Sequence, residues 1–164
     1  EISISDAGET AGMLRRIWET RALIERHALI SYCDTFIDLD VEGMMRNHVR
    51  QRAGATIVSA RIRNPFGLVT LDSDNWVTSF VEKPVLNYYI GSFILNKSAL
   101  SHVTPEMLSS EDGGGLVSFF DELGRRNLLA GFEHEGMQIT FNTESERREA
   151  EEYLGRFFTV TEEQ

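Results

Sequence analysis

A chain of 164 residues is long enough for one domain with its own hydrophobic core but short for two. Its formal net charge of −10 argues against a nucleic-acid partner bound through the phosphate backbone. The hydrophobic fraction of 41% fits a soluble globular protein, and no apolar run approaches membrane-spanning length.

The only cysteine, Cys33, lies inside an apolar run, so no disulfide framework exists and a reducing, cytoplasmic location is expected. The chain begins without an initiating Met or a signal peptide. Its first residues, Ile2 to Ser5, alternate as a strand does, so the sequence starts as if in mid-strand. We therefore expect a fragment of a longer protein.

The stretch from Ala28 to Asp34 is a short apolar run that stops at a carboxylate. It predicts a central strand of an α/β sheet, with Asp34 at its carboxyl end. In open α/β sheets that end lines the ligand crevice, where a carboxylate can hold a metal ion against phosphate oxygens. Taken alone, Asp34 fits a helix cap or a turn equally well.

Helical and strand patterns alternate along the rest of the chain and predict an α/β fold with a mixed sheet. Asp40 is expected to cap a helix that Gly54 ends, and Asp72 to Asn75 to form the tip of a hairpin. The other expected elements are a loop over 6–12, a helix over 13–24, strands over 55–62, 66–71, 77–81 and 88–95, a short helix over 98–103, a linker over 111–115, a helix over 116–125, strands over 128–132 and 137–141, and a helix over 144–158.

Glu82-Lys83-Pro84 stands at the end of the second hairpin arm, where Pro84 stops the strand. A cation there can hold a phosphate and the neighbouring carboxylate can accept hydrogen bonds from sugar hydroxyls, although a surface ion pair is the simpler interpretation of the motif alone. Gly91 inside a strand indicates close approach of a ligand or of another backbone. The scattered histidines have no second ligand at helical spacing, so zinc is not expected.

The order of several short motifs resembles the sugar-1-phosphate nucleotidyltransferases, with the nearest similarity to glucose-1-phosphate cytidylyltransferases. Each motif is short, but their order extends over nearly the whole chain. They are Thr10-Ala11-Gly12-Met13, Tyr32-Cys33-Asp34, Phe66-Gly67-Leu68, Glu82-Lys83-Pro84, Gly91-Ser92-Phe93, His134-Glu135-Gly136 and Asn142-Thr143.

The resemblance implies a mixed, mostly parallel Rossmann-like sheet flanked by helices and lacking its first βαβ unit. Residues 1–164 would form one nucleotidyltransferase-like domain, roughly the C-terminal two thirds of the family's usual length. The implied reaction is attack of a sugar 1-phosphate oxygen on the α-phosphorus of a nucleoside triphosphate, with release of pyrophosphate and with Mg²⁺ as cofactor. Such chemistry depends on positioning and charge neutralisation.

The resemblance also implies roles for individual residues. The catalytic residues would be Asp34 and Lys83, and Asp34 and Asn142 would bind the metal. The backbone of Thr10, Ala11 and Gly12 would face the nucleobase. Gly67 would meet the sugar through its backbone, Glu82 would bind the sugar hydroxyls and Lys83 the sugar phosphate. Gly91 would also belong to the substrate-binding residues.

The sequence also departs from the family pattern. It lacks the Gly-rich loop that grips the triphosphate, so the stretch alone is not expected to be active. Asn142 stands where a second metal-binding Asp is usual and offers a neutral oxygen, which binds Mg²⁺ more weakly. Cys33 and Glu9 replace glycines, and Tyr89 replaces one of a polar pair that often contacts the sugar.

These departures leave two alternatives open. One is a catalytically inactive nucleotidyltransferase-like module for binding or assembly, in which a partner chain or a missing N-terminal segment completes the sheet. The other is a metal-dependent nucleotide-sugar glycosyltransferase that uses Asp38 and Asp40 as an Asp-x-Asp motif. Against the second, Asp40 is the better helix cap, and Glu82-Lys83-Pro84 would have no role.

Overall fold

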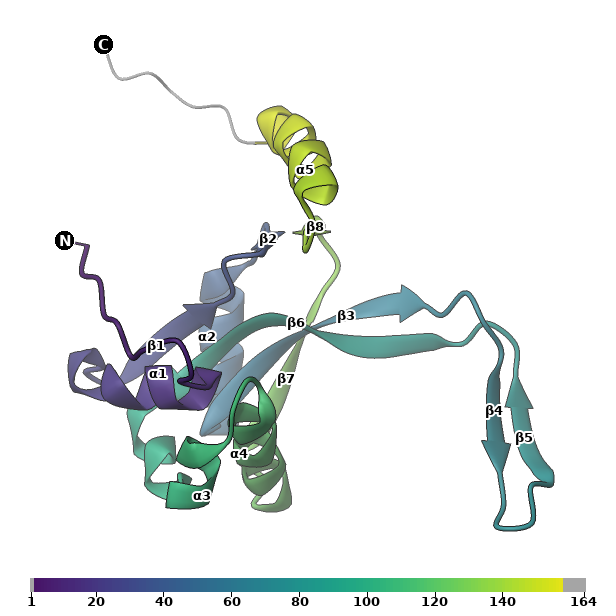
Figure 1. Ribbon diagram of the computed structural model, residues 1–164, viewed down its shortest axis with the longest axis horizontal. Helices are drawn as coiled ribbons and strands as arrows, with labels where there is room; N and C mark the ends of the chain where they lie inside the picture. Colours follow the sequence, from purple (N-terminus) through teal and green to yellow (C-terminus); the bar gives the residue numbers. More distant parts are fainter. Residues whose placement is uncertain (1, 158–164) are drawn as a thin grey trace.

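The computed structural model describes residues 2–157 (Figure 1). Its helical elements are α1 (Met13–Glu19), η1 (Arg21–Leu23), α2 (Val41–Gln51), η2 (Lys97–His102), α3 (Pro105–Ser109), α4 (Gly114–Arg125) and α5 (Glu144–Phe157), of which η1 and η2 are 3₁₀ segments. Its strands are β1 (His27–Ser31), β2 (Thr35–Ile37), β3 (Ala55–Arg63), β4 (Leu68–Leu71), β5 (Val77–Val81), β6 (Val85–Asn96), β7 (Leu129–His134) and β8 (Gln138–Thr140).

Four strands form the main sheet, in the order β1-β6-β3-β7. β6 is antiparallel to both of its neighbours, β1 and β3, whereas β7 is parallel to β3. Three of the four strands therefore run in one direction, although β3 and β7 form the one parallel pair among the described strands of this sheet, and the sheet is mixed as expected.

The expected central position of the strand after Ala28 is wrong within the part of the chain that the structure describes. Among the described strands β1 pairs with β6 alone and lies at one edge of the sheet. The reason is that β6, much later in the chain, inserts between β1 and β3. An apolar run indicates that both faces of a strand are covered by other elements. It does not indicate how many strands pair with it.

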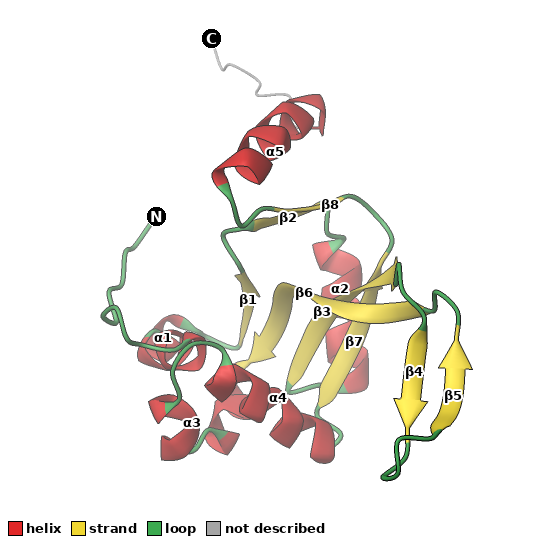
Figure 2. Ribbon diagram, turned by 45° about the vertical axis from the view of Figure 1, so that its right-hand side comes forward, coloured by secondary structure: helices red, strands yellow, loops and turns green. Residues whose placement is uncertain are grey.

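Helices cover both faces of this sheet (Figure 2). On one face, side chains of α1 and α4 such as Leu14 and Phe119 pack with Phe93 of β6 in the larger core cluster. On the other face, Met44 of α2 packs with Ile94 in a smaller cluster. The alternation of neighbouring β6 side chains between the two faces thus joins three layers.

The β4–β5 hairpin projects away from this body at the end of a long arm made by β3 and β6 (Figures 1 and 2). At its tip Asp72 Oδ1 accepts hydrogen bonds from the backbone N–H groups of Asp74 (3.0 Å) and Trp76 (2.9 Å). These bonds explain the turn that the polar sequence predicts. The pairing of β4 with β5 confirms the expected hairpin.

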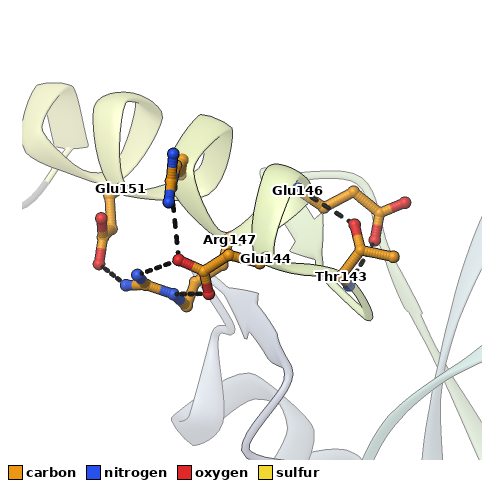
Figure 3. Close-up of polar contacts among 6 residues, drawn as sticks. Thr143, Glu144, Glu146, Arg147 and Glu151 are labelled. Atoms are coloured by element: carbon orange, nitrogen blue, oxygen red, sulfur yellow. Dashed lines mark hydrogen bonds and ion pairs between the residues drawn. The ribbon is translucent and has the colours of Figure 1, made fainter.

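At the C-terminal end, β8 pairs with β2 in a short ribbon that leads into α5. The Thr143 hydroxyl accepts a hydrogen bond from the Glu146 N–H (3.2 Å), and the Glu146 carboxylate accepts one from the Thr143 N–H (3.1 Å) (Figure 3). This reciprocal pair is a capping box. Further ion pairs follow on the helix between Glu144, Arg147 and Glu151.

Several local expectations are wrong. Residues 2–5 form no strand, and Ile2 and Ile4 are almost fully exposed because no described strand lies beside them. α2 ends at Arg52, which adopts the left-handed conformation, before Gly54 is reached. The expected last helix does form, but Phe158 lies outside the described residues.

The glycines at 113–115 do not form a linker, because α4 begins at Gly114. A Cβ at Gly115 would collide with the Met107 carbonyl oxygen of α3, so the glycine allows α3 and α4 to pack closely. The short helix α3 itself was not expected from the sequence, although Thr104 caps it and Pro105 occupies its first turn. Within residues 2–157, no helix combines the length and the apolar character needed to cross a bilayer.

Candidate functional site

Asp34 lies in the turn between β1 and β2, past the carboxyl end of β1, as the sequence predicts. Its side chain is half-buried, and its Oδ1 accepts a hydrogen bond from the Thr35 hydroxyl (3.2 Å). Its carbonyl oxygen accepts another from the Phe141 N–H (3.0 Å). Asp34 is therefore tied to the segment just after β8, more than a hundred residues later in the chain.

The same ribbon brings the second expected metal ligand near Asp34. Thr35 pairs with Thr140, so the antiparallel ladder carries the segment that ends in Asn142 alongside the turn holding Asp34. The hydroxyl oxygens of Thr35 and Thr140 lie 3.3 Å apart. The sequence analysis did not identify these two threonines, because only the pairing of two three-residue strands reveals them.

Asn142 itself is exposed and lies just before α5. Its backbone N–H donates to Glu146 Oε2 (2.7 Å), and this bond lowers the pKa of Glu146. The backbone of Asn142 thus belongs to the cap of α5, whereas its side-chain oxygen is the group to which the family resemblance gives a metal-binding role.

The residues around Asp34 fit a weakly held divalent cation. Within residues 2–157, no group of three or more His, Cys, Asp and Glu side chains is placed to hold a metal ion. Mg²⁺ does not require such a cage, because it commonly uses one or two carboxylates together with substrate phosphates and water. Asp34 offers one carboxylate of this kind.

Gly91 lies next to this turn. Its carbonyl oxygen accepts a hydrogen bond from the Tyr32 N–H (3.0 Å), and its φ of +81° is in the left-handed region. The close neighbour of Gly91 is the ring of Tyr32, which a Cβ at position 91 would approach to 3.0 Å. The sequence indicates that a ligand or another backbone comes close to Gly91. In the structure the close neighbour is Tyr32 of the same chain.

Tyr89 belongs to an aromatic cluster beside Gly91. Its ring meets those of Tyr32 and Phe120 edge to face, with centroids 5.9 and 5.8 Å apart. Burial, and then the neighbouring Tyr32, raises the pKa of Tyr89. Tyr89 thus acts first as a packing residue between β6 and α4.

The loop expected to face a nucleobase lies at the start of α1. The Arg16 guanidinium donates to the carbonyl oxygens of Ala11 (2.9 Å) and Gly8 (3.0 Å) and holds the loop that contains Thr10. Gly12 is buried, and a Cβ there would collide with the Ser110 carbonyl oxygen. Close packing against the loop before α4 gives a structural reason for this glycine.

Gly67 and Glu82 lie together at the base of the hairpin. A Cβ at Gly67 would come within 3.0 Å of the Phe80 ring and within 3.4 Å of Glu82 Oε2. Lys83 follows in the left-handed conformation (φ 44°), and its ammonium group lies 3.9 Å from Glu82 Oε1. Both charged side chains are more than half exposed. The structure therefore gathers Gly67, Glu82 and Lys83 of the expected sugar 1-phosphate residues at the base of the hairpin, whereas Gly91 lies elsewhere, beside Tyr32.

The structure does not bring Lys83 near Asp34. Tyr32 contacts β6 at Gly91, whereas Lys83 precedes the first residue of that strand. Lys83 stands eight positions before Gly91, which at strand spacing corresponds to at most about 25 Å. The expected residues thus fall into two groups, one beside Gly91 and one at the base of the β4–β5 hairpin.

The two carboxylates of the Asp-x-Asp motif have separate structural roles. Asp40 Oδ1 accepts a hydrogen bond from the Gly43 N–H (2.8 Å), which confirms that Asp40 caps α2. Asp38 Oδ1 lies 3.3 Å from Nε2 of His134, which also lies 3.0 Å from the Met137 carbonyl oxygen. Because a carbonyl oxygen only accepts, His134 Nε2 carries the hydrogen.

The sequence profile of a family described as Nucleotidyl transferase matches residues 1–115. The chain belongs to the nucleotidyl transferase family. The match confirms the resemblance seen in the motifs, whereas the nearer similarity to cytidylyltransferases stays a prediction. The matched residues of this nucleotidyl transferase chain include Asp34 and Lys83, and Asn142 lies outside them.

Solved structures share the fold of the nucleotidyl transferase chain. A Bacillus anthracis protein assigned as a glucose-1-phosphate thymidylyltransferase, solved with sucrose, superposes with a TM-score of 0.69 at 15% identity, over 98% of this chain and 66% of that protein. HddC from Yersinia pseudotuberculosis gives a TM-score of 0.59, and its complex with GMP-PN gives 0.58, each at 18% identity over 90% of this chain and 64% of that protein.

The chain thus spans slightly less than two thirds of the length of these relatives. No curated protein matches the sequence significantly. At these identities the structural likenesses establish the architecture of the nucleotidyl transferase chain and leave its substrates to be proposed.

Proposed function

We propose that the protein containing this chain transfers a nucleotidyl group from a nucleoside triphosphate to a sugar 1-phosphate. The observation that carries the proposal is the family match over residues 1–115, which includes Asp34 at the carboxyl end of β1. The assignment of the Bacillus anthracis neighbour as a glucose-1-phosphate thymidylyltransferase supports a sugar 1-phosphate as acceptor.

In the proposed reaction a phosphate oxygen of the sugar 1-phosphate attacks the α-phosphorus of the triphosphate. A new P–O bond forms, the bond to the β-phosphate breaks, and pyrophosphate leaves. The Lys83 ammonium group would neutralise the sugar phosphate, and the neighbouring Glu82 carboxylate would accept hydrogen bonds from sugar hydroxyls. The backbone of Thr10, Ala11 and Gly12 would face the nucleobase.

Asp34, with the neutral oxygen of Asn142 as a weaker second ligand, would hold Mg²⁺. When bound, the cation neutralises negative charge on the phosphates and helps to position them. The hydrogen bond from Thr35 restrains the Asp34 carboxylate, and the bond from Phe141 restrains its backbone. Cytoplasmic location, expected from the cysteine usage, remains part of this proposal.

Two observations favour one second candidate. Lys83 stands about 25 Å along the chain from Gly91, the β6 residue that contacts the segment leading to Asp34, and the Asn142 position offers no charge to a metal ion. A domain that binds a sugar phosphate without transferring a nucleotidyl group, and that serves in binding or assembly, agrees with this geometry. The glycosyltransferase alternative gains no support, because Asp40 caps a helix.

Pyrophosphate release separates the two candidates. The full-length protein is assayed with a panel of nucleoside triphosphates and sugar 1-phosphates in the presence of Mg²⁺. We expect release that requires one particular pair, which would also name the substrates. If a folded full-length protein binds a sugar 1-phosphate but releases no pyrophosphate with any pair of the panel, the transferase proposal is rejected. The binding module is then the remaining candidate.

A further inference from the structure

The short β2–β8 ribbon, which lies between the main sheet and α5, supports the turn that holds Asp34 (Figure 2). Thr35 of β2 pairs with Thr140 of β8, and one residue further along, the Asp34 carbonyl oxygen accepts from the Phe141 N–H. The rings of Phe36 and Phe141 stack on the ribbon, with centroids 5.9 Å apart and planes 24° from parallel. A backbone bond and an aromatic contact thus fix this turn on β8, although neither of them reaches the Asp34 carboxylate.

Two threonine hydroxyl groups do extend to the carboxylate. The Thr35 hydroxyl oxygen lies 3.2 Å from Asp34 Oδ1 and 3.3 Å from the hydroxyl oxygen of Thr140. An ionised carboxylate only accepts hydrogen bonds, so the single hydroxyl hydrogen of Thr35 is donated to Asp34. The hydrogen between the two threonines must then come from Thr140. The hydrogen bonds therefore form a chain with one direction, from Thr140 through Thr35 to Asp34.

The two threonines differ in their access to water. Thr35 is only 9% exposed, whereas Thr140 is an exposed residue. Water readily takes the place of an exposed hydroxyl group but not of a buried one. Loss of the Thr35 hydroxyl should therefore leave the Asp34 carboxylate without a restraint on this side, and loss of the Thr140 hydroxyl should have a smaller effect.

We propose that Thr35 and Thr140 are positioning residues of a divalent-cation site, in which their hydrogen-bond chain holds the Asp34 carboxylate in the orientation that binds the ion. The inference rests on the metal-binding role of Asp34 in the proposed function, and it adds two residues that lie outside the motifs. Hydrogen bonds to a ligating carboxylate commonly contribute about 10- to 100-fold to metal affinity. The orientation of Asp34 matters more in this chain because the second proposed ligand, Asn142, offers a neutral oxygen.

Binding of Mn²⁺ alone to the full-length protein tests the proposal, because Mn²⁺ also prefers oxygen ligands and its free form is counted by electron paramagnetic resonance. We expect Asp34→Asn to lose this binding and Thr35→Val, which keeps the shape of the side chain, to weaken it about ten-fold. Thr35→Ser keeps the hydroxyl group and should bind within about two-fold of the wild type. Thr140→Val should weaken binding about two- to three-fold.

The matched control is Ser31→Ala. Ser31 and Ser92 form a hydroxyl pair of the same kind across β1 and β6, with their oxygens 2.8 Å apart, and Asp34 is not part of it. This variant should bind Mn²⁺ as the wild type does. Circular dichroism verifies that each variant is folded.

The proposal is overturned if Thr35→Val binds Mn²⁺ as tightly as the wild type, if Thr35→Ser binds as weakly as Thr35→Val, or if Ser31→Ala weakens binding equally. Mn²⁺ binding that is absent from the wild type or unchanged in Asp34→Asn also overturns it. Pyrophosphate release by the same proteins separates this outcome from the proposed function. A wild type that binds Mn²⁺ through Asp34 and Thr35 but releases no pyrophosphate contradicts the transferase and supports the positioning role.

Discussion

The ring of Tyr32 lies against Gly91, where the backbone has a φ of +81°. A Cβ at this position would approach Tyr32 Cδ2 to 3.0 Å, so Gly91→Ala has to strain the backbone and displace the ring. We expect the free energy of unfolding to fall by about 1–3 kcal/mol, measured by urea denaturation.

Gly131→Ala is the matched control for this prediction. Gly131 also lies in a strand of the main sheet, but a Cβ there would have no heavy atom within 4 Å. We expect a change within about 0.5 kcal/mol. Equal effects of the two substitutions would show that contact with Tyr32 does not explain Gly91.

Asp34→Asn keeps the size of the side chain and removes its charge. If Asp34 holds Mg²⁺, pyrophosphate release by the full-length protein should fall on the order of 100-fold, while the thermal midpoint stays close to that of the wild type. Asp121→Asn, on the exposed side of α4, is the control and should keep full activity. An active Asp34→Asn variant would remove this carboxylate from the proposed metal site.

Lys83→Ala tests the proposed sugar-phosphate site at the base of the β4–β5 hairpin. Loss of a charge-assisted hydrogen bond should weaken binding of a sugar 1-phosphate about 10- to 100-fold, measured by titration calorimetry with the full-length protein. The only other lysine, Lys97, provides the control Lys97→Ala, which should bind as the wild type does. Unchanged binding in Lys83→Ala would mean that the phosphate is held elsewhere.

His48 makes the folded state sensitive to acid. It is 1% exposed, its Nδ1 lies 2.7 Å from the Thr56 hydroxyl, and its ring meets that of His27 edge to face. Burial, and then the neighbouring His27, lowers the pKa of His48. The unfolded chain therefore takes up a proton below about pH 6.5 that the folded chain resists, so stability is complete above that pH and decreases as the pH falls.

Urea denaturation between pH 8 and pH 5 measures this dependence. We expect His48→Gln to lose part of the decrease seen in the wild type, because the variant has no imidazole to titrate at this position. An identical decrease in the two proteins would attribute the acid sensitivity to other groups.

Thr143→Ala removes the hydroxyl that caps α5 (Figure 3). We expect a local loss of about 1 kcal/mol. Backbone amides in the first turn of α5 should then exchange with deuterium roughly five-fold faster. Ser145→Ala, in the same turn but outside the capping box, should exchange at the wild-type rate, and equal protection in Thr143→Ala would show that the cap contributes little.

The elements that the sequence predicts well are those whose cause is local. Asp40 caps α2, and Asp72 organises the hairpin tip, because the side chain and the backbone group it binds are a few residues apart. The edge position of β1 depends on β6, which follows more than fifty residues later. Local pattern carries no information about that insertion.

The candidate site shows the same division. The position of Asp34 after β1 follows from the pattern of one segment, whereas the hydroxyls of Thr35 and Thr140 meet only because two distant three-residue strands pair. The resemblance names Asp34 and Lys83 but gives no distance between them. Their separation depends on how β3 and β6 extend beyond the core, which is a property of the whole sheet.

The irregular pairing between β3 and β6 gives the arm a pivot. The register shifts between Ile57 and Ser59, beside Gly91, and beyond this point β6 continues in one piece to the base of the hairpin. A small change of bend at the pivot therefore becomes a displacement of several ångströms at Lys83, about 25 Å along the strand. Any contact that immobilises the hairpin thus also sets the distance between the two halves of the proposed site.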